Sequence, residues 1–350
     1  MIYDQLDRLR RARGRWLDMG GLAPVETPSR VVFASPPVTL KAYADPGASG
    51  PVLLIVPAPI KRAYLWDLVP EISVVRRCLQ HGVRPYLIQW ERPGPDDHSL
   101  GLAEYADEYI HACQQAIAAE TGAQATFVAG HSLGGVLAVI FAALHPENVR
   151  GLILLSAPLR FGSGTGAFAP VVARAPHAAT LTALMPENVP GSFLNTVSIL
   201  TSPGTFEGER LTDWWRSLAD PQALNVHLRV MRWTLDEQPL PRRLFEEVVE
   251  LLYRENRFME GTLTVSGQPA HPAALTMPII SVVEPHSALI PPEAVLPFHA
   301  AAGSSDTRVL WYQGDVGVVL QHLGMLVGRR AHQELWPEIL AWMHARAADA

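Results

Sequence analysis

Residues 128–147, VAGHSLGGVLAVIFAALHPE, decide the fold. Within them GHSLG (130–134) fits the pattern G-x-S-x-G. The run QATFVAG (124–130) before the serine has the apolar character of a buried strand, and the apolar segment after it has the length of a helix. A serine at such a strand–turn–helix corner is held with its hydroxyl above the edge of the sheet. The sequence therefore predicts Ser132 as a nucleophile and the backbone N–H of Leu133 as a donor to a developing oxyanion.

Other short apolar runs resemble the strand before this serine, and helical patterns separate them. The strand-like runs are 51–59, 83–90, 149–158, 277–283 and 307–313, and the helical patterns are 72–81, 102–121, 133–145 and 332–346. Such alternation implies a mostly parallel sheet with helices on both faces, as in the α/β-hydrolase fold. Between 160 and 275 long helical stretches replace it, which is typical of an inserted lid. We expect an N-terminal helical extension (1–29), an α/β core (30–159 and 276–350) and a mainly helical cap (160–275).

Composition narrows the class of protein. The chain has 350 residues, 48% of them hydrophobic, and a formal charge of −6 that argues against nucleic-acid binding. No secretory signal and no run of about 18 apolar residues is visible, so we expect a cytoplasmic protein without a transmembrane segment. Cys78 and Cys113 are expected to be reduced, and no Cys/His cluster has zinc spacing. We expect neither a metal nor a cofactor.

The segment 2–19 has apolar residues near helical spacing, interspersed with five arginines at 8, 10, 11, 13 and 15. We interpret it as an exposed helix with a solvated face. Docking to a partner, a membrane surface or an anionic polymer is the alternative.

A serine nucleophile needs a base, most often a histidine late in the chain after the last strand. His322 follows the strand predicted at 307–313 and precedes the closing helix, so we predict it as the base, in a loop. His286 lies in an earlier loop and His332 within the closing helix. His131 adjoins Ser132, but its side chain is expected to point elsewhere.

The second oxyanion donor is expected in the loop VPAPIKRAY (56–64). Pro57 and Pro59 have no N–H and cannot donate. Ala58 and Ile60 remain, and we favour Ile60.

Several segments together resemble a known family. They are 51–90, the elbow VAGHSLGG (128–135), the loop around His322, and 231–267, where the matching residues are Trp233, Asp236, Tyr253, Asn256 and Gly261. This pattern resembles that of the polyhydroxyalkanoate synthases, particularly the class III type, which works with a second subunit. The resemblance implies an α/β-hydrolase core with a cap, and an enzyme that polymerises (R)-3-hydroxyacyl-CoA through an acyl-enzyme.

The chain departs from that family at two positions. The resemblance implies a cysteine nucleophile where this chain has Ser132, and an aspartate where it has Ser287. A serine acyl-enzyme is an oxygen ester, which favours hydrolysis or simple transfer over polymerisation, since a thiolate is the better leaving group. Ser287 cannot stabilise an imidazolium by charge. Glu284 is then the first candidate for the catalytic acid and Asp315 the second, and a Ser–His pair without an acid is the third reading.

We therefore expect a serine acyl hydrolase or acyltransferase that acts on an acyl thioester, such as a hydroxyacyl-CoA, or on an ester. His131, Ala58, Trp233 and Asp236 are candidates for the lining of the substrate pocket. Trp214, Trp215 and Trp233 either enclose an acyl chain or form the core of the cap. Two other functions stay open: a non-hydrolytic enzyme that polymerises, condenses or cyclises, and an inactive subunit that binds a partner or a polyester granule. A homodimer and a partner subunit are both compatible with the sequence.

Overall fold

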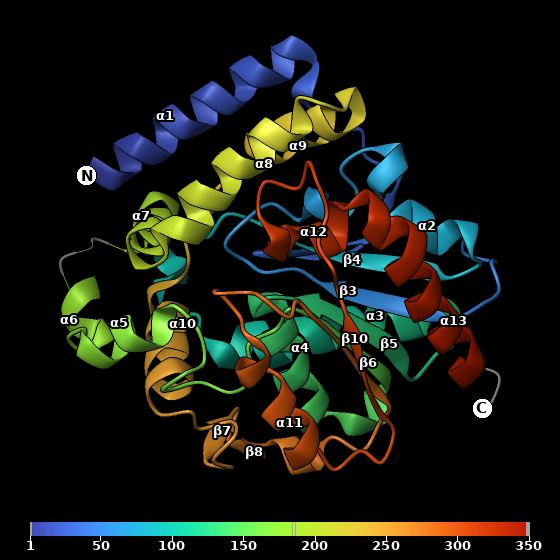
Figure 1. Ribbon diagram of the computed structural model, residues 1–350. Helices are drawn as coiled ribbons and strands as arrows, with labels where there is room; N and C mark the ends of the chain where they lie inside the picture. Colours follow the sequence, from blue (N-terminus) through green and yellow to red (C-terminus); the bar gives the residue numbers. More distant parts are fainter. Residues whose placement is uncertain (1, 184, 186, 348–350) are drawn as a thin grey trace.

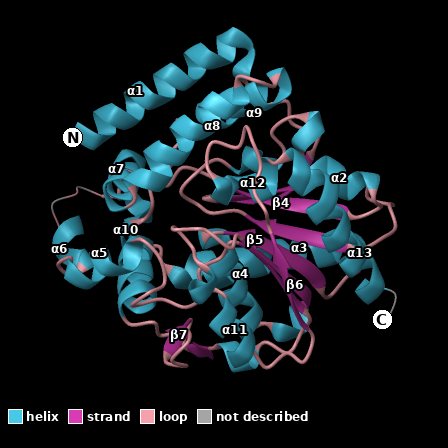
Figure 2. Cartoon of the chain, in the orientation of Figure 1, coloured by secondary structure: helices cyan, strands magenta, loops and turns pink. Residues whose placement is uncertain are grey.

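The computed structural model describes residues 2–183, 185 and 187–347, and in this part of the chain an eight-stranded sheet forms the centre (Figures 1 and 2). The strand order is β1-β2-β4-β3-β5-β6-β9-β10. The strands are β1 (Arg30–Ser35), β2 (Val38–Ala42), β3 (Val52–Val56), β4 (Arg84–Trp90), β5 (Thr126–His131), β6 (Val149–Leu155), β9 (Ile279–Val283) and β10 (Thr307–Trp311). β1 pairs antiparallel with β2, and β2 with β4, whereas all later pairs are parallel. The prediction of a mostly parallel sheet is confirmed.

Helices cover both faces of this sheet, because successive side chains of its buried strands point to opposite sides. On β3, Leu54 packs into one apolar cluster and Leu53 into the other. The Leu54 side is covered by α3 (Tyr109–Thr121), α4 (Leu133–Leu144) and α11 (Leu296–Ala301), and the Leu53 side by α2 (Val74–Gln80), α12 (Gln321–Val327) and α13 (Trp336–Ala347). The continuous apolar sequence of α4 follows from its burial on almost every side.

Helices also make up most of the chain between β6 and β9. They are α5 (Phe168–Arg174), α6 (Ala178–Thr182), α7 (Gly191–Thr201), the π-helical turn η7 (Gly204–Glu209), α8 (Arg210–Ser217), α9 (Pro221–Trp233), α10 (Arg242–Glu247) and the π-helical turn η8 (Val248–Arg254). A short hairpin follows, β7 (Leu263–Val265) with β8 (Gln268–Ala270), and its buried residues join the same apolar cluster as α4. The last part of the predicted cap range therefore packs on the core.

The prediction of a loop at His322 is wrong. Leu320 is extended, and α12 begins at Gln321, so His322 occupies the first turn of a helix. Every residue of α12 from His322 to Val327 is buried, which explains the apolar sequence of this helix. The predicted closing helix is present, with a π-helical turn, η11 (Ala331–Leu335), ahead of α13.

The N-terminal helix α1 (Ile2–Leu17) packs on α7 and on α9 (Figure 1). Its buried residues are Asp7 and Gly14, while Leu9 and Trp16 are 65% and 67% exposed. Arg8, Arg13 and Arg15 are exposed as well, so the predicted exposed helix carries both charged and apolar side chains on its outward side. Among the described residues, no helix has the length and hydropathy needed to cross a membrane.

Candidate active site

Ser132 lies at the corner between β5 and α4, with φ 55° and ψ −129°. A Cβ on Gly130 would lie 2.5 Å from the carbonyl oxygen of Gly134, and one on Gly134 would lie 2.8 Å from the amide nitrogen of Ala58. Glycine is therefore required on both sides of the serine. The local geometry is that of a nucleophile elbow, and the assignment of Ser132 as nucleophile stays a prediction.

Two backbone N–H groups lie near Ser132, one at the start of α4 and one in the segment after β3. Leu133 is the first residue of α4, where N–H groups have no partner within the helix. The amide nitrogen of Ala58 is close to Gly134, as the glycine geometry shows. The carbonyl oxygen of Ile60 accepts the N–H of Gln238 at 3.0 Å. The contacts favour Ala58 over Ile60 as the second oxyanion donor, and neither role is tested.

His322 lies beside the elbow through its contact with His131. The two imidazole rings are 4.4 Å apart, centroid to centroid, and His131 Nε2 donates to the carbonyl oxygen of His322 at 2.8 Å. His131 therefore ties α12 to the elbow. Among the described residues, His322 Nε2 and Ser132 Oγ have no hydrogen bond to each other or to another side chain. The structure brings the predicted nucleophile and base to one place without joining them.

Burial keeps both imidazoles neutral. It lowers the pKa of His322 well below the ordinary value, and the neighbouring His131 lowers this pKa further. Burial also lowers the pKa of His131 to about 4. A neutral His322 at pH 7 has the protonation state that a general base needs.

No carboxylate among the described residues hydrogen-bonds to His322. Its Nδ1 lies 3.2 Å from the hydroxyl oxygen of Ser156, the residue after β6. Sequence reasoning missed Ser156, although its signal was present: it ends the strand that neighbours β5, at the same edge of the sheet as the elbow. Ser287 is turned to its own loop, where its Oγ accepts the N–H of Ile290 at 3.1 Å.

The two candidate acids occupy other environments. Burial, and to a smaller extent the charge of Glu209, raises the pKa of Glu284 to about 7. A hydrogen bond with Ser287 opposes this shift. Asp315 accepts the N–H of Arg330 at 2.9 Å and the hydroxyl of Tyr312 at 3.1 Å, so it caps the start of η11. The role of Glu284 as the acid stays a prediction without a supporting contact.

Carboxylates of the cap hold the chain just before His322. Asp213, on α8, accepts the N–H groups of Gly317 and Val319, both at 2.8 Å, and lies 2.7 Å from His227 Nδ1. Burial raises the pKa of Asp213, but its hydrogen bonds from His227 and the two amides outweigh burial and lower it. Glu209 accepts the N–H of the residue before His322 at 3.2 Å. Cap and candidate base are therefore mechanically connected.

Trp233 and Asp236 hold the segment after β3 to the cap. Trp233 Nε1 donates to the carbonyl oxygen of Arg62 at 2.8 Å, and Asp236 accepts the hydroxyl of Tyr64 at 2.7 Å. Trp214 and Trp215 are 36% and 61% exposed, so neither is part of the cap's core.

Both thiols lie away from the elbow. Cys78 on α2 and Cys113 on α3 are buried and not paired with each other. Burial raises the pKa of Cys78 to about 12 and raises that of Cys113 as well. Neither is a reactive thiolate at neutral pH.

Comparison with known proteins agrees with this architecture. Residues 66–187 match the family described as alpha/beta hydrolase fold. Among solved structures, a monoacylglycerol lipase from Paleococcus ferrophilus has a TM-score of 0.57 at 15% identity, over 88% of this chain and 99% of the lipase. That likeness shows the fold alone, and it confirms the predicted fold class.

Two curated relatives extend over most of the chain. The poly(3-hydroxyalkanoate) polymerase subunit PhaC of Haloferax mediterranei is 30% identical over 98% of this chain and 69% of its own length. The subunit of the same name from Allochromatium vinosum is 26% identical over 91% of this chain and 89% of its own. The fold and these relatives together support an acyl-transferring enzyme. The chain belongs to the PhaC family of poly(3-hydroxyalkanoate) polymerase subunits.

Proposed function

We propose that this chain is a serine acyl hydrolase. It takes a hydroxyacyl group from a thioester or ester onto Ser132 and releases it to water. One observation carries the proposal: Ser132 stands on a strained corner beside the buried His322, and within the described chain neither Ser132 Oγ nor His322 Nε2 has a hydrogen-bond partner. Hydrogen bonds in free active sites are often long and tighten when substrate binds, so the missing contact is compatible with catalysis.

The acylation step needs groups that these residues supply. His322 Nε2 takes the proton of Ser132 Oγ while Oγ attacks the acyl carbonyl carbon. The N–H groups of Leu133 and Ala58 stabilise the resulting oxyanion. The carbon–sulfur bond of a thioester then breaks, and His322 returns the proton to the leaving sulfur. Water repeats the sequence on the acyl-serine and releases the free acid.

Ser156 orients the base but supplies no charge. An Nδ1–H donated to the Ser156 hydroxyl leaves Nε2 as the basic nitrogen. A neutral hydroxyl stabilises the imidazolium less than a carboxylate does, and replacing a triad aspartate costs about 10⁴-fold in kcat in a protease. We therefore expect slow turnover unless substrate binding compensates.

Labelling with a fluorophosphonate followed by intact-mass measurement tests the proposal. One adduct on the wild-type chain is expected, and none on Ser132→Ala or His322→Ala. His286→Ala, an exposed histidine outside the site, serves as the matched control and should label normally. A folded wild-type chain that takes no label would contradict the proposal and favour an inactive binding subunit.

Polymer building is the second candidate, and the names of the relatives favour it. In that case the hydroxyl of a second hydroxyacyl group replaces water as the acceptor. Incubation with 3-hydroxybutyryl-CoA separates the two: free 3-hydroxybutyrate supports hydrolysis, and polymer overturns it in favour of synthesis.

A further inference from the structure

The outward side of α1 carries large apolar side chains that no other part of the described chain covers. Ile2, Leu6, Leu9 and Trp16 are exposed, and they follow one another at intervals of four, three and seven residues. At these intervals side chains lie on one face of a helix, so the four residues form a stripe along α1. Met19, also exposed, continues the stripe into the turn after the helix. A contiguous apolar face of this kind marks an interaction site, whereas single exposed apolar residues do not.

Arginines accompany this stripe. Arg13 lies within it, and Arg15 adjoins it; both are exposed, and neither forms an ion pair within the residues that the structure describes. Arg8 is exposed too and, two turns before Arg15, lies along the same edge of the stripe. The carboxylates of α1 are Asp4, which is partly buried, and Asp7, which is buried. The outward side of the helix is therefore both apolar and positively charged, on a chain whose formal charge is −6.

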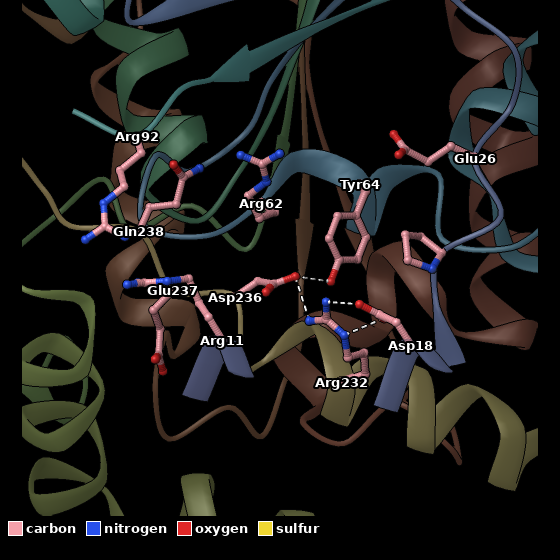
Figure 3. Close-up of a pocket in the computed structure, with 11 residues that line it drawn as sticks. Arg11, Asp18, Glu26, Arg62, Tyr64, Arg92, Arg232, Asp236, Glu237 and Gln238 are labelled. Atoms are coloured by element: carbon pink, nitrogen blue, oxygen red, sulfur yellow. Dashed lines mark hydrogen bonds and ion pairs between the residues drawn. The ribbon is translucent and has the colours of Figure 1, made fainter. Parts of the chain in front are cut away.

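The side of α1 that faces the protein has its charges paired. Arg10 lies 2.6 Å from Glu237, and Asp7 accepts a backbone N–H of α7 at 2.8 Å. Asp18, just after the helix, lies 2.7 Å from Arg232, and Figure 3 shows this pair beside the segment after β3. The helix cannot turn its apolar stripe inward without breaking these contacts. The stripe is therefore exposed because of the way α1 is attached to the cap.

The combination of apolar and positive groups limits what can cover this face. A two-fold contact between two copies of α1 would place arginines against arginines, which is repulsive. An uncharged apolar surface would desolvate Arg13 and Arg15 without giving them a partner. An anionic phospholipid bilayer suits both kinds of group, because apolar side chains enter the boundary of headgroups and acyl chains while guanidinium groups meet the phosphates.

The position of α1 suits contact with a flat surface. The helix lies at the outer edge of the molecule, away from the central sheet (Figure 1). Its 16 residues extend over about 24 Å, and the stripe runs from Ile2 to Trp16 along this length. Tryptophan is favoured at the depth of the lipid headgroups. A helix of this length lies in the plane of the surface, since crossing a bilayer takes about 20 apolar residues.

We infer that α1 binds the surface of an anionic phospholipid bilayer, with Leu9 and Trp16 among the headgroups and Arg13 and Arg15 against the phosphates. The inference goes beyond the proposed function and does not depend on the chemistry at Ser132. It assigns a partner to the one predicted segment of the chain, 2–19, that the candidate active site does not use.

Sedimentation of the full-length chain with unilamellar vesicles tests the electrostatic part. Binding is expected to vesicles of equal parts phosphatidylglycerol and phosphatidylcholine, and much weaker binding to vesicles of phosphatidylcholine alone. Arg13→Gln and Arg15→Gln should each weaken binding to the charged vesicles about fivefold, which corresponds to about 1 kcal/mol per charge near an anionic surface. Arg174→Gln, at an exposed position on α5, is the matched control and should bind as tightly as the wild-type chain.

The apolar part has its own variants. Leu9→Gln and Trp16→Gln remove side chains that would leave water on binding, and each should weaken binding to the charged vesicles about tenfold. Trp311→Gln, at an exposed tryptophan on the edge strand β10, is the matched control and should not change the affinity. All of these positions are exposed, so the variants are expected to keep the wild-type melting temperature, which is measured alongside.

The remaining outcomes overturn the inference. Equal affinity for charged and neutral vesicles would exclude the arginines, and wild-type affinity in all four α1 variants would place the contact elsewhere on the chain. Absence of vesicle binding also overturns it: a dimer that Trp16→Gln dissociates would then favour a second copy, and binding to particles of poly(3-hydroxybutyrate) would favour a polyester surface. Fluorophosphonate labelling without vesicles tests the proposed function separately, so the failure of one does not imply the failure of the other.

Discussion

At the scale of single residues, backbone strain gathers around His322. Ser132, Ser156 and Val319 all have positive φ, at 55°, 46° and 68°. Such a conformation is unfavourable for any side chain and most of all for a β-branched one such as Val319. Ser132 supplies the candidate nucleophile, Ser156 contacts the ring of His322, and Val319 lies three residues before it. Strain of this kind persists where the surrounding structure enforces it, often at a functional site.

The Ser156 hydroxyl should contribute to turnover by orienting His322. Ser156→Ala removes the hydrogen-bond partner of Nδ1, and we expect kcat for thioester turnover to fall about five- to tenfold, the equivalent of one net hydrogen bond. Ser287→Ala is the matched control, because Ser287 is also a buried serine after a strand but bonds its own loop. Equal effects of the two substitutions would exclude a role for Ser156 in positioning.

Glu284 should make stability depend on pH. Its pKa of about 7 exceeds the ordinary 4.5, so between these values the folded chain binds more protons than the unfolded one. The free energy of unfolding therefore falls as pH rises from 4.5 to 7 and stays reduced above that. Glu284→Gln removes the penalty, and at pH 8 we expect it to be more stable than wild type by on the order of 1–3 kcal/mol.

Urea unfolding of both proteins at pH 5 and pH 8 measures this difference. It should be small at pH 5 and full at pH 8. Glu108→Gln, at an exposed position, is the control. A stabilisation of equal size at both pH values would show that ionisation of Glu284 is not its cause.

At the scale of helices and strands, burial decided what could be predicted. The strands β3, β5 and β6 are continuous apolar runs buried on both sides, and the sequence located each within a few residues. β1 and β2 were both missed. The residues of β1 are half-buried or exposed and its pairing is irregular, and β2 alternates buried with half-buried residues instead of forming a continuous apolar run. α12 was missed because it is short, contains a glycine and follows an extended residue.

The residues of the candidate site also fall into two groups, those that the sequence predicted and those that it did not. Ser132 was predicted from a local motif and His322 from its order along the chain, and both lie at the elbow. The place of Ser156 at the same sheet edge follows from its position after β6, but its contact with His322 does not, because that contact depends on how α12 is oriented against β6. The tie between Asp213 and the loop before α12 is likewise a contact between distant segments.

That tie should control the position of the candidate base. Asp213→Asn replaces a buried carboxylate that accepts from two amides and pairs with His227, and breaking a buried pair typically costs about 3–5 kcal/mol. We expect a lower melting temperature and, in the folded variant, a reduced kcat with little change in KM. Glu207→Gln, six residues earlier and in an exposed ion pair, is the control for both measurements. If kcat is unchanged in the folded Asp213→Asn chain, the cap does not position His322.

At the scale of the whole molecule, α1 joins the N-terminus to the cap. It does so through polar contacts: Arg10 pairs with Glu237, and Asp18 just after the helix pairs with Arg232. Its larger apolar side chains Ile2, Leu6, Leu9 and Trp16 are exposed rather than buried. The attachment of α1 therefore depends on close approach and charge more than on apolar burial.

Gly14 makes that approach possible, and its replacement should detach the helix. A Cβ at Gly14 would lie 2.8 Å from a guanidinium nitrogen of Arg232, which is fixed between Asp18 and Asp236. Gly14→Leu must displace either that guanidinium or α1, at a cost of about 1–3 kcal/mol. At roughly 2–4 °C per kcal/mol for a chain of this order of size, the melting temperature should fall by several degrees. Gly20→Leu, where a Cβ meets nothing within 4 Å, is the matched control. A Gly14→Leu chain with the melting temperature of wild type would mean that α1 is not held through Arg232.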